Sequence, residues 1–310
     1  MEFKHISVMK EECIKALNIV PGGIYFDGTL GGAGHSKAIL ESGENVKLIA
    51  TDLDTDAIMV AKENLAEYEG KFNLVHDNFK NFSAIMKNLN VGLIDGALLD
   101  LGVSSYQLDE RSRGFSYMAK EERLNMRMNQ QASFSAYDVV NDYSEKDLTY
   151  ILKTYGEERF AGLIAKNIVK ARQIKPIETC GELVEIVDRS IPKKYSDQGH
   201  PAKRTFQAIR IEVNGELEGL EKAIKDIVYG LKKGGRLCVI TFHSLEDRIV
   251  KNAFKDLETD CICDKSLPIC ICGKRKEIVL VNKKPIVAGE NEVTFNPRAK
   301  SAKLRICERI

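Results

Sequence analysis

The chain has no run of apolar residues that approaches the roughly 18 needed to cross a bilayer. Its start, residues 1–12, lacks the basic region followed by an apolar stretch that defines a signal peptide. It also has no internal repeat and no low-complexity tract. These absences argue against a membrane-spanning or secreted protein, and we expect a cytoplasmic globular protein with no membrane partner.

An excess of charge of one sign is also missing, because 46 Lys and Arg residues against 45 Asp and Glu residues leave a net charge of +1. Total charge therefore gives no indication of a nucleic-acid partner. From Lys265 to Ile310, however, eleven Lys or Arg residues stand against four Glu residues. This basic region suits contact with phosphates, and a solvated charged surface explains it equally well.

The length of 310 residues exceeds one average domain, and an apolar share of 44% is enough for a sizeable core. Short apolar runs alternate with helical patterns in the first hundred residues and again after residue 200. This alternation predicts an α/β fold, a parallel sheet covered by helices. The expected strands are 24–26, 46–50, 72–75, 94–99, 236–241, 277–281 and 303–308. The expected helices of this part are 33–42, 55–68 with Asp54 as its cap, 205–231 after which Gly234 and Gly235 form a turn, and 245–257.

Residues 106–200 contain helical patterns and no convincing strand. Helices are expected at 143–155, 159–173 and 178–190. The simplest arrangement is one α/β core, made by residues 1–105 and 201–310, with an inserted helical domain of residues 106–200.

A glycine-rich turn, residues 27–35, lies between the first strand and the first helix. Its glycines at 28, 31, 32 and 34 allow a tight turn and close approach of a ligand. The spacing departs from the G-x-G-x-x-G pattern of dinucleotide sites, and an acidic residue, Asp27, opens the loop. An acid suits a cofactor that carries an amino group, and S-adenosylmethionine is such a cofactor. A structural turn without a ligand is the alternative.

Two further residues follow strand ends near this turn. Asp52 is placed to accept hydrogen bonds from a ribose diol, as it would be in a dinucleotide site too. Phe79 suits packing against an adenine ring, and a core phenylalanine is the alternative.

Polar side chains also follow the fourth and fifth expected strands. Asp100 and Ser104 follow the fourth, and His243, Ser244 and Asp247 follow the fifth. Because both loops open on the cofactor side of the sheet, these residues are the candidate catalytic groups. The alternatives are that Ser244 or Asp247 caps the helix beginning at Leu245 and that His243 is structural.

A cysteine nucleophile for carbon methylation has no obvious position, because the chain contains no Pro-Cys dipeptide. Methyl transfer to a heteroatom is therefore favoured, with the enzyme holding donor and acceptor in line. An aromatic amine is a weak nucleophile, and Asp100 or a loop carbonyl is suited to accept hydrogen bonds from its protons and orient its lone pair.

Six stretches together closely resemble the bacterial RsmH (MraW) family over essentially the whole chain. They are Asp27–His35, Leu98–Ser105, Lys153–Phe160, His200–Arg210, Phe242–Lys251 and Asn296–Ser301. The resemblance implies a class I (Rossmann-like) methyltransferase sheet with a helical insertion. It further implies methylation of N4 of a cytidine in the decoding centre of 16S ribosomal RNA within the small ribosomal subunit, with S-adenosylmethionine as cofactor.

The resemblance also implies site residues. By matched position the cofactor contacts are Ala33, Gly34, His35, Asp52, Phe79, Asp100 and Gln107, beside Asp27 and Gly28 of the turn. The insertion and the segment 200–210 are the expected RNA-facing part, with Lys203, Arg204 and Arg210 as phosphate contacts, although Arg210 also suits pairing within the fold.

The chain departs from related patterns at two places. The Pro-Pro-Tyr loop of most amino-methyltransferases is replaced by residues 100–103, so no residue is assigned to stack on the target base. Tyr106 stands where the family usually has proline, and it is a candidate for that role. Two other functions stay open: a non-catalytic RNA-binding assembly factor and, less favoured, a nicotinamide-dependent dehydrogenase.

Four cysteines form two Cys-x-Cys pairs, Cys261 with Cys263 and Cys270 with Cys272. Four thiolates are able to bind zinc, but structural zinc sites usually have Cys-x2–4-Cys spacing. Alternation along a hairpin places each pair on one face and allows packing without metal. No metal ligand is therefore assigned, and zinc stays an open alternative.

Overall fold

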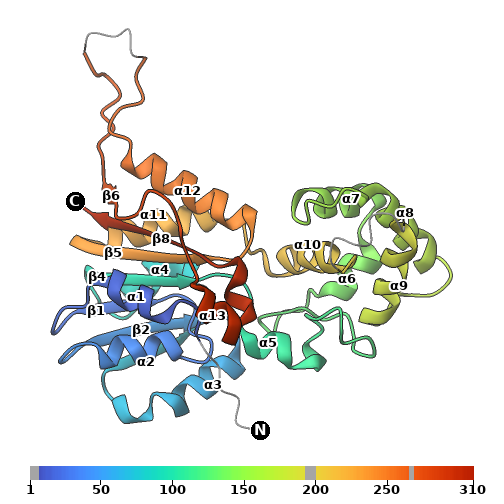
Figure 1. The fold of residues 1–310 in the computed structure, drawn as a ribbon, viewed down its shortest axis with the longest axis horizontal. Helices are drawn as coiled ribbons and strands as arrows, with labels where there is room; N and C mark the ends of the chain where they lie inside the picture. Colours follow the sequence, from blue (N-terminus) through green and yellow to red (C-terminus); the bar gives the residue numbers. More distant parts are fainter. Residues whose placement is uncertain (1–6, 193–199, 265–268) are drawn as a thin grey trace. The chain divides into compact units, whose positions relative to one another are not determined.

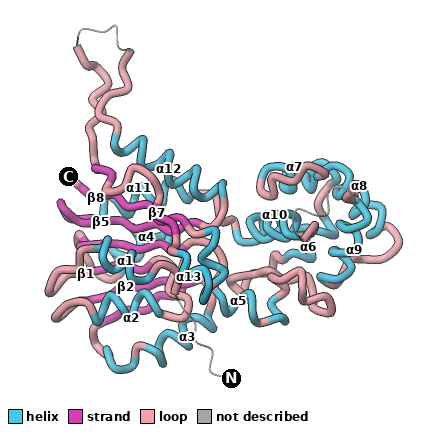
Figure 2. The backbone as a smooth tube through the Cα atoms, viewed as in Figure 1, coloured by secondary structure: helices cyan, strands magenta, loops and turns pink. Residues whose placement is uncertain are grey.

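The computed structural model describes residues 7–192, 200–264 and 269–310. It divides into two compact units, coloured along the chain in Figure 1 and by secondary structure in Figure 2. The sheet unit comprises Met1–Gly102 and Leu217–Ile310, and the helical unit comprises Val103–Glu216. In the described ranges, none of the helices combines the length and the hydropathy needed to cross a membrane.

The sheet unit is built on one mixed sheet. Its strands are, from one edge, β3 (Phe72–His76), β2 (Lys47–Asp52), β1 (Ile24–Asp27), β4 (Ile94–Asp100), β5 (Leu231–Thr241), β8 (Lys303–Arg309) and β6 (Ile278–Leu280), with β7 (Ile286–Val287) also paired to β8. Neighbours from β3 to β5 are parallel, and β8 is antiparallel to β5, β6 and β7. The order 3-2-1-4-5 is that of the doubly wound, Rossmann-like fold, and the predicted α/β class is confirmed.

Successive strand residues alternate between two hydrophobic cores, because side chains along a strand point to opposite faces. Tyr25 and Leu98 belong to one core and Phe26 and Leu99 to the other. The first core is covered by α1 (Lys10–Leu17), α2 (Gly34–Glu41) and α3 (Thr55–Asn64). The second is covered by α4 (Phe82–Asn88), α11 (Leu220–Gly230) and α12 (Ser244–Glu258). Burial on both faces explains why these strands have near-continuous apolar sequences.

Every strand expected from the sequence is present, and the Asp54 side chain caps α3 by accepting a hydrogen bond from the amide of Asp56.

Two expectations near residue 230 are wrong. The single helix expected at 205–231 is two helices, α10 (Lys203–Asn214) and α11, and Gly215 ends α10 in the left-handed conformation. Gly234 and Gly235 lie within β5, where the register against β4 shifts, rather than in a turn before the strand.

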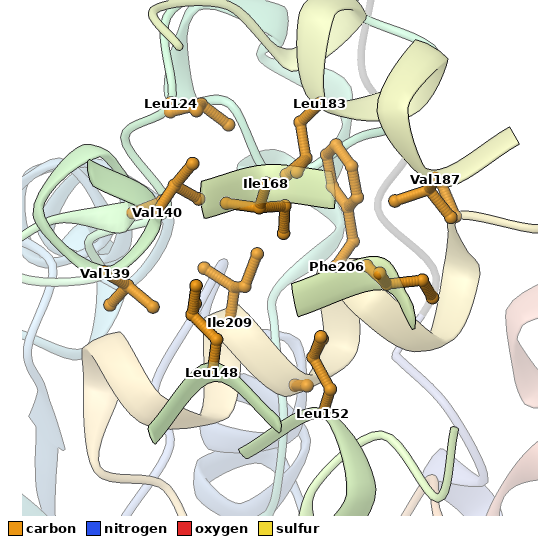
Figure 3. Close-up of a cluster of buried hydrophobic side chains, with 14 of the residues drawn as sticks. Leu124, Val139, Val140, Leu148, Leu152, Ile168, Leu183, Val187, Phe206 and Ile209 are labelled. Atoms are coloured by element: carbon orange, nitrogen blue, oxygen red, sulfur yellow. The ribbon is translucent and has the colours of Figure 1, made fainter. Parts of the chain in front are cut away.

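The helical unit packs around its own core, part of which Figure 3 shows. Its helices are α5 (Ser105–Asp109), α6 (Ala136–Asp142), α7 (Glu145–Thr154), α8 (Ala161–Arg172), α9 (Cys180–Ser190) and α10. Phe206 and Ile209 of α10 point into this core (Figure 3). The insertion therefore ends at Glu216, later than the predicted boundary at residue 200, because the buried face of α10 packs with the inserted helices.

Candidate active site

The strand order of the sheet reverses between β1 and β4. In doubly wound sheets ligands bind at such a point, beyond the carboxyl ends of the strands. Asp27 is the last residue of β1, Asp52 of β2 and Asp100 of β4. Three of the predicted carboxylates therefore end three neighbouring strands at the edge where a ligand is expected.

Asp27 anchors the glycine-rich loop from inside. Its carboxylate is fully buried and accepts hydrogen bonds from the Ser36 hydroxyl at 2.7 Å and the Thr29 amide at 3.1 Å. Burial raises the pKa of Asp27, and the hydrogen bonds from Ser36 and Thr29 oppose that rise. Because both of these contacts lie within the chain, Asp27 fixes the path of the loop into α2.

Glycine is required at two positions of this loop by close approach of neighbouring atoms. A Cβ atom at Gly28 would lie 2.4 Å from Leu99 Cδ2 and 2.8 Å from the Cβ atom of Phe79. At Gly34 it would lie 2.0 Å from the Ser7 hydroxyl oxygen. These contacts place the half-buried Phe79 beside the loop, and they explain the glycine spacing by packing as well as by ligand access.

Ala33 precedes α2 in the left-handed conformation, with φ of 63°. It is buried, and its amide donates to the carbonyl of Leu30 at 2.8 Å. The strained alanine therefore closes the turn from which α2 begins.

Asp52 joins the loop to the end of β2. Its two carboxylate oxygens accept hydrogen bonds from the amides of Gly31, at 2.8 Å, and Asp54, at 2.9 Å. Burial raises the pKa of Asp52 to about 6, against the effect of these two amides. Each oxygen keeps a second lone pair for a hydroxyl donor.

Within the part of the chain that the structure describes, Asp100 carries a polar atom at this edge without a hydrogen-bond partner, as does His243, at Nε2, just beyond the end of β5. Its Oδ1 is buried without a hydrogen-bond partner among the described residues. Its Oδ2 lies 3.8 Å from Nδ1 of the buried His35, and its amide donates to the Thr29 hydroxyl at 2.6 Å. Burial, followed by the charges of Asp27 and Glu246, raises the pKa of Asp100 well above its ordinary value. A buried acceptor without a partner is costly unless a ligand supplies the donor.

His243 and Glu246 form the start of α12. The His243 ring accepts from the amide of Glu246, and the Glu246 carboxylate accepts from the amide of His243, which together make a capping box. The Nε2 atom of His243 lies 3.1 Å from Oε1 of Glu246. The expectation that Ser244 or Asp247 caps this helix is therefore wrong, because the helix begins one residue earlier, at Ser244.

The other two candidates on α12 face different surroundings. Ser244 is exposed. Asp247 accepts hydrogen bonds from Arg305 of β8 at 2.7 and 3.2 Å and lies 3.5 Å from the ammonium of Lys303. Burial raises the pKa of Asp247, but Arg305 and Lys303 outweigh burial and leave it lowered. These contacts are those of a residue that ties α12 to β8.

The predicted residues of the helical unit make contacts within that unit. Ser104 and Gln107 form the capping box of α5, and Gln107 is buried. Lys203 and Arg204 are exposed at the start of α10. Arg210 forms a two-pronged ion pair with Glu216 at 2.8 and 2.9 Å, so its alternative role, pairing within the fold, is the one observed.

The sequence profile of the MraW methylase family matches residues 2–310. The chain belongs to this family. The ribosomal RNA small subunit methyltransferase H of Clostridium botulinum (strain Loch Maree / Type A3) is 57% identical over 100% of both chains, and that of Clostridioides difficile (strain 630) is 55% identical over the same share. An rRNA methylase of known structure from Streptococcus thermophilus covers 100% of this chain and 99% of its own, with 11% identity and a TM-score of 0.41.

The sequence analysis did not identify three residues at this candidate site, namely Thr29, Ser36 and Glu246. The Thr29 hydroxyl accepts a hydrogen bond from the amide of Asp100, and the Ser36 hydroxyl donates one to the Asp27 carboxylate. Glu246 is buried at the start of α12. A capping-box pattern, with an acid three residues after the cap, was the available signal for Glu246. It is easily overlooked here because histidine occupies the cap position.

Proposed function

We propose that this MraW-family protein transfers a methyl group from S-adenosylmethionine to N4 of a cytidine in the decoding centre of 16S ribosomal RNA, in the cytoplasm. The observation that carries the proposal is the Asp100 carboxylate. It has a buried oxygen without a partner, it stands at the strand-order reversal, and it lies beside the glycine-rich loop. The names of the curated relatives support ribosomal RNA of the small subunit as the substrate class.

The residues at this edge fit a cationic nucleoside cofactor. Asp27, Asp52 and Asp100 form an acidic edge in which burial raises all three pKa values, so a bound positive charge would relieve an existing electrostatic cost. S-adenosylmethionine, when bound, supplies an electrophilic methyl group on a positively charged sulfur. A pyrophosphate would instead meet these carboxylates as a like charge, which disfavours the dehydrogenase alternative.

Each residue has a role that follows from its position. Asp52 would accept hydrogen bonds from the ribose hydroxyls, and the half-buried Phe79 would contact the adenine ring. Oδ1 of Asp100 would accept a hydrogen bond from the target amine and turn the nitrogen lone pair toward the methyl group. The raised pKa of Asp100 suits it to take up the proton that the amine releases.

Cofactor affinity should fall in acid because Asp52 titrates near neutrality. The ionised carboxylate is the stronger acceptor, and protonation turns one of its oxygens into a donor. The affinity for S-adenosylhomocysteine should therefore fall by up to about tenfold between pH 7 and pH 5, through the pKa of about 6. The effect on stability has the opposite sign. A carboxyl group whose pKa is higher in the folded chain destabilises that chain when ionised, so acidification removes this cost in the ligand-free protein.

Calorimetric titrations at several pH values would measure this change. Asp52→Asn should bind weakly at every pH and lose most of the pH dependence, whereas Asp56→Asn, in the first turn of α3, should keep it. An unchanged affinity between pH 7 and pH 5 in the unsubstituted protein would rule out the role of Asp52.

RNA recognition by the helical unit rests on the exposed Lys203 and Arg204 at the start of α10. Changing both to alanine should weaken binding to small-subunit RNA about tenfold and flatten its salt dependence, because two phosphate contacts are lost. Affinity for S-adenosylhomocysteine should not change. Lys222→Ala with Lys225→Ala is the matched control, since these lysines of α11 are paired with Asp226, Glu221 and Asp256. Equal losses in the two double variants would argue against a specific RNA contact on α10.

The reaction itself is tested by incubating the protein and labelled S-adenosylmethionine with small subunits that lack the modification. Mass spectrometry of the digested RNA should place one label on N4 of one decoding-centre cytidine. Labelling at carbon 5 or on another nucleotide would overturn the proposed specificity. RNA binding without any labelling would favour the non-catalytic assembly factor.

A further inference from the structure

Four cysteine side chains converge on the segment between α12 and β6, which belongs to the sheet unit. In Figure 1 two extended stretches lead away from α12 and return to β6. The Sγ–Sγ distance is 3.5 Å for Cys261 and Cys270, 3.6 Å for Cys270 and Cys272, and 3.9 Å for both Cys263–Cys270 and Cys261–Cys272. All four sulfurs lie within 4.8 Å of one another.

These distances match a metal-centred tetrahedron. Zinc binds thiolate sulfur at about 2.3 Å in tetrahedral geometry, which separates the sulfurs by roughly 3.8 Å. They are too long for disulfides, in which the sulfurs are about 2.05 Å apart. They are also shorter than the separations expected around a four-iron cluster, whose ligands bind different iron atoms.

The backbone is arranged to support negative charge on the sulfurs. The amide of Ile262 points at Cys272 Sγ at 3.5 Å, that of Cys263 at Cys261 Sγ at 3.4 Å, and that of Ile271 at Cys263 Sγ at 3.3 Å. Amide donors to metal-bound thiolates are the outer contacts that orient ligands and stabilise their charge.

In this segment the apolar side chains face solvent and the cysteine side chains face inward, which is the reverse of a hydrophobic cluster. Ile262, Ile269 and Ile271 are 68%, 74% and 78% exposed, whereas the thiols turn toward one another. Neither stretch is a β-strand over residues 259–264 and 269–276. Lys274 and Lys276 pair with Asp256 and Glu258 of α12, outside the cysteine region. Between Cys261 and Cys272 the sulfur atoms contact one another and backbone amides across the two stretches, so the sulfur cluster links them.

We propose that Cys261, Cys263, Cys270 and Cys272 bind one zinc ion. Four thiolates fill a tetrahedral site and leave no position for water or substrate, so the ion is structural and not catalytic. The alternation of side chains along each stretch brings both cysteines of a Cys-x-Cys pair to the same side, which explains how this unusual spacing makes a four-sulfur site. The ion would fix the two stretches that join α12 to β6.

Metal analysis of the full chain, purified without chelators or an affinity tag that binds metal, tests this directly. Mass spectrometry should find about one zinc per chain, and less than about a tenth of that in the Cys261→Ser, Cys270→Ser double variant. Ile271→Ser, an exposed change between two ligands, and Cys13→Ala, a change to a buried cysteine of α1, should both keep one zinc. Unfolding curves establish that the variants are folded.

A second readout concerns the segment itself. Removing zinc with a chelator should speed tryptic cleavage after the exposed Arg275 by at least about tenfold and leave S-adenosylhomocysteine binding unchanged. Absence of metal, stoichiometric iron in place of zinc, a Cys261–Cys270 disulfide, or full zinc content in the double variant would each overturn the proposal. None of these outcomes depends on methyl transfer.

Discussion

Asp100→Asn is expected to lower the rate of methyl transfer to small subunits by about 10² to 10³-fold, the loss typical of removing one oriented group from an active site. Asparagine preserves the shape but removes the charge and replaces one acceptor oxygen by a donor. The unfolding temperature of the ligand-free protein should stay the same or rise. The reason is that the substitution removes a half-buried carboxylate whose ionisation is opposed by desolvation and by the charges of Asp27 and Glu246.

The same strand offers a matched control. Asp95, near the other end of β4, accepts from the amide of Ile24 and pairs with Lys232 at 2.8 Å. Asp95→Asn should therefore show the opposite pattern, with transfer retained within about twofold and stability lowered by about 0.5–2 kcal/mol. Single-turnover rates and thermal melts measure both properties. An Asp100→Asn protein with normal transfer would eliminate the proposed role of this carboxylate.

Gly28→Ala is expected to abolish detectable cofactor binding and to lower the free energy of unfolding by about 1–3 kcal/mol. The added methyl group would lie 2.4 Å from Leu99 Cδ2 and 2.8 Å from the Cβ atom of Phe79, so the loop, the β4 side chain or Phe79 must move. Any of these movements displaces residues that we assign to the cofactor. Calorimetry with S-adenosylhomocysteine and denaturant titration measure the two effects.

Gly92→Ala is the control for the loss of glycine itself, because no atom lies within 4 Å of a Cβ atom at that position. It should bind cofactor normally and unfold within about 0.5 kcal/mol of the unsubstituted protein. If Gly28→Ala bound cofactor with unchanged affinity, the glycine-rich loop would have only a structural role.

The sequence predicted the sheet well because its strands are buried on both faces and end at acidic residues. The details it missed depend on tertiary contacts. Gly234 and Gly235 have the composition of a turn, yet they lie within β5, at the shift between its pairing with β4 at Leu231 and its pairing from Arg236 onward. Similarly, the sequence pattern assigned α10 to the α/β core, because strand and helix patterns resume after residue 200. Its apolar face instead packs against the helices of the insertion.

The positions of Asp27, Asp52 and Asp100 at strand ends were predictable, because each comes at the end of a buried, mostly apolar run. Contacts between a side chain and a backbone group distant in the sequence were less predictable. Nothing in the local sequence shows that Thr29 accepts a hydrogen bond from the amide of Asp100, 71 residues away. Asp247 lies on α12, and its partner Arg305 is 58 residues away on β8. Such pairs become visible only when the fold brings them together.

We expect the acidic edge formed by β1, β2 and β4 to bind S-adenosylmethionine. Titration of the protein with S-adenosylhomocysteine in a calorimeter at pH 7.5 tests it most directly, with NADH titrated in parallel. We expect one binding site per chain for S-adenosylhomocysteine, lost in Gly28→Ala, and no heat of binding for NADH. Saturable binding of NADH, or no binding of S-adenosylhomocysteine, would contradict it.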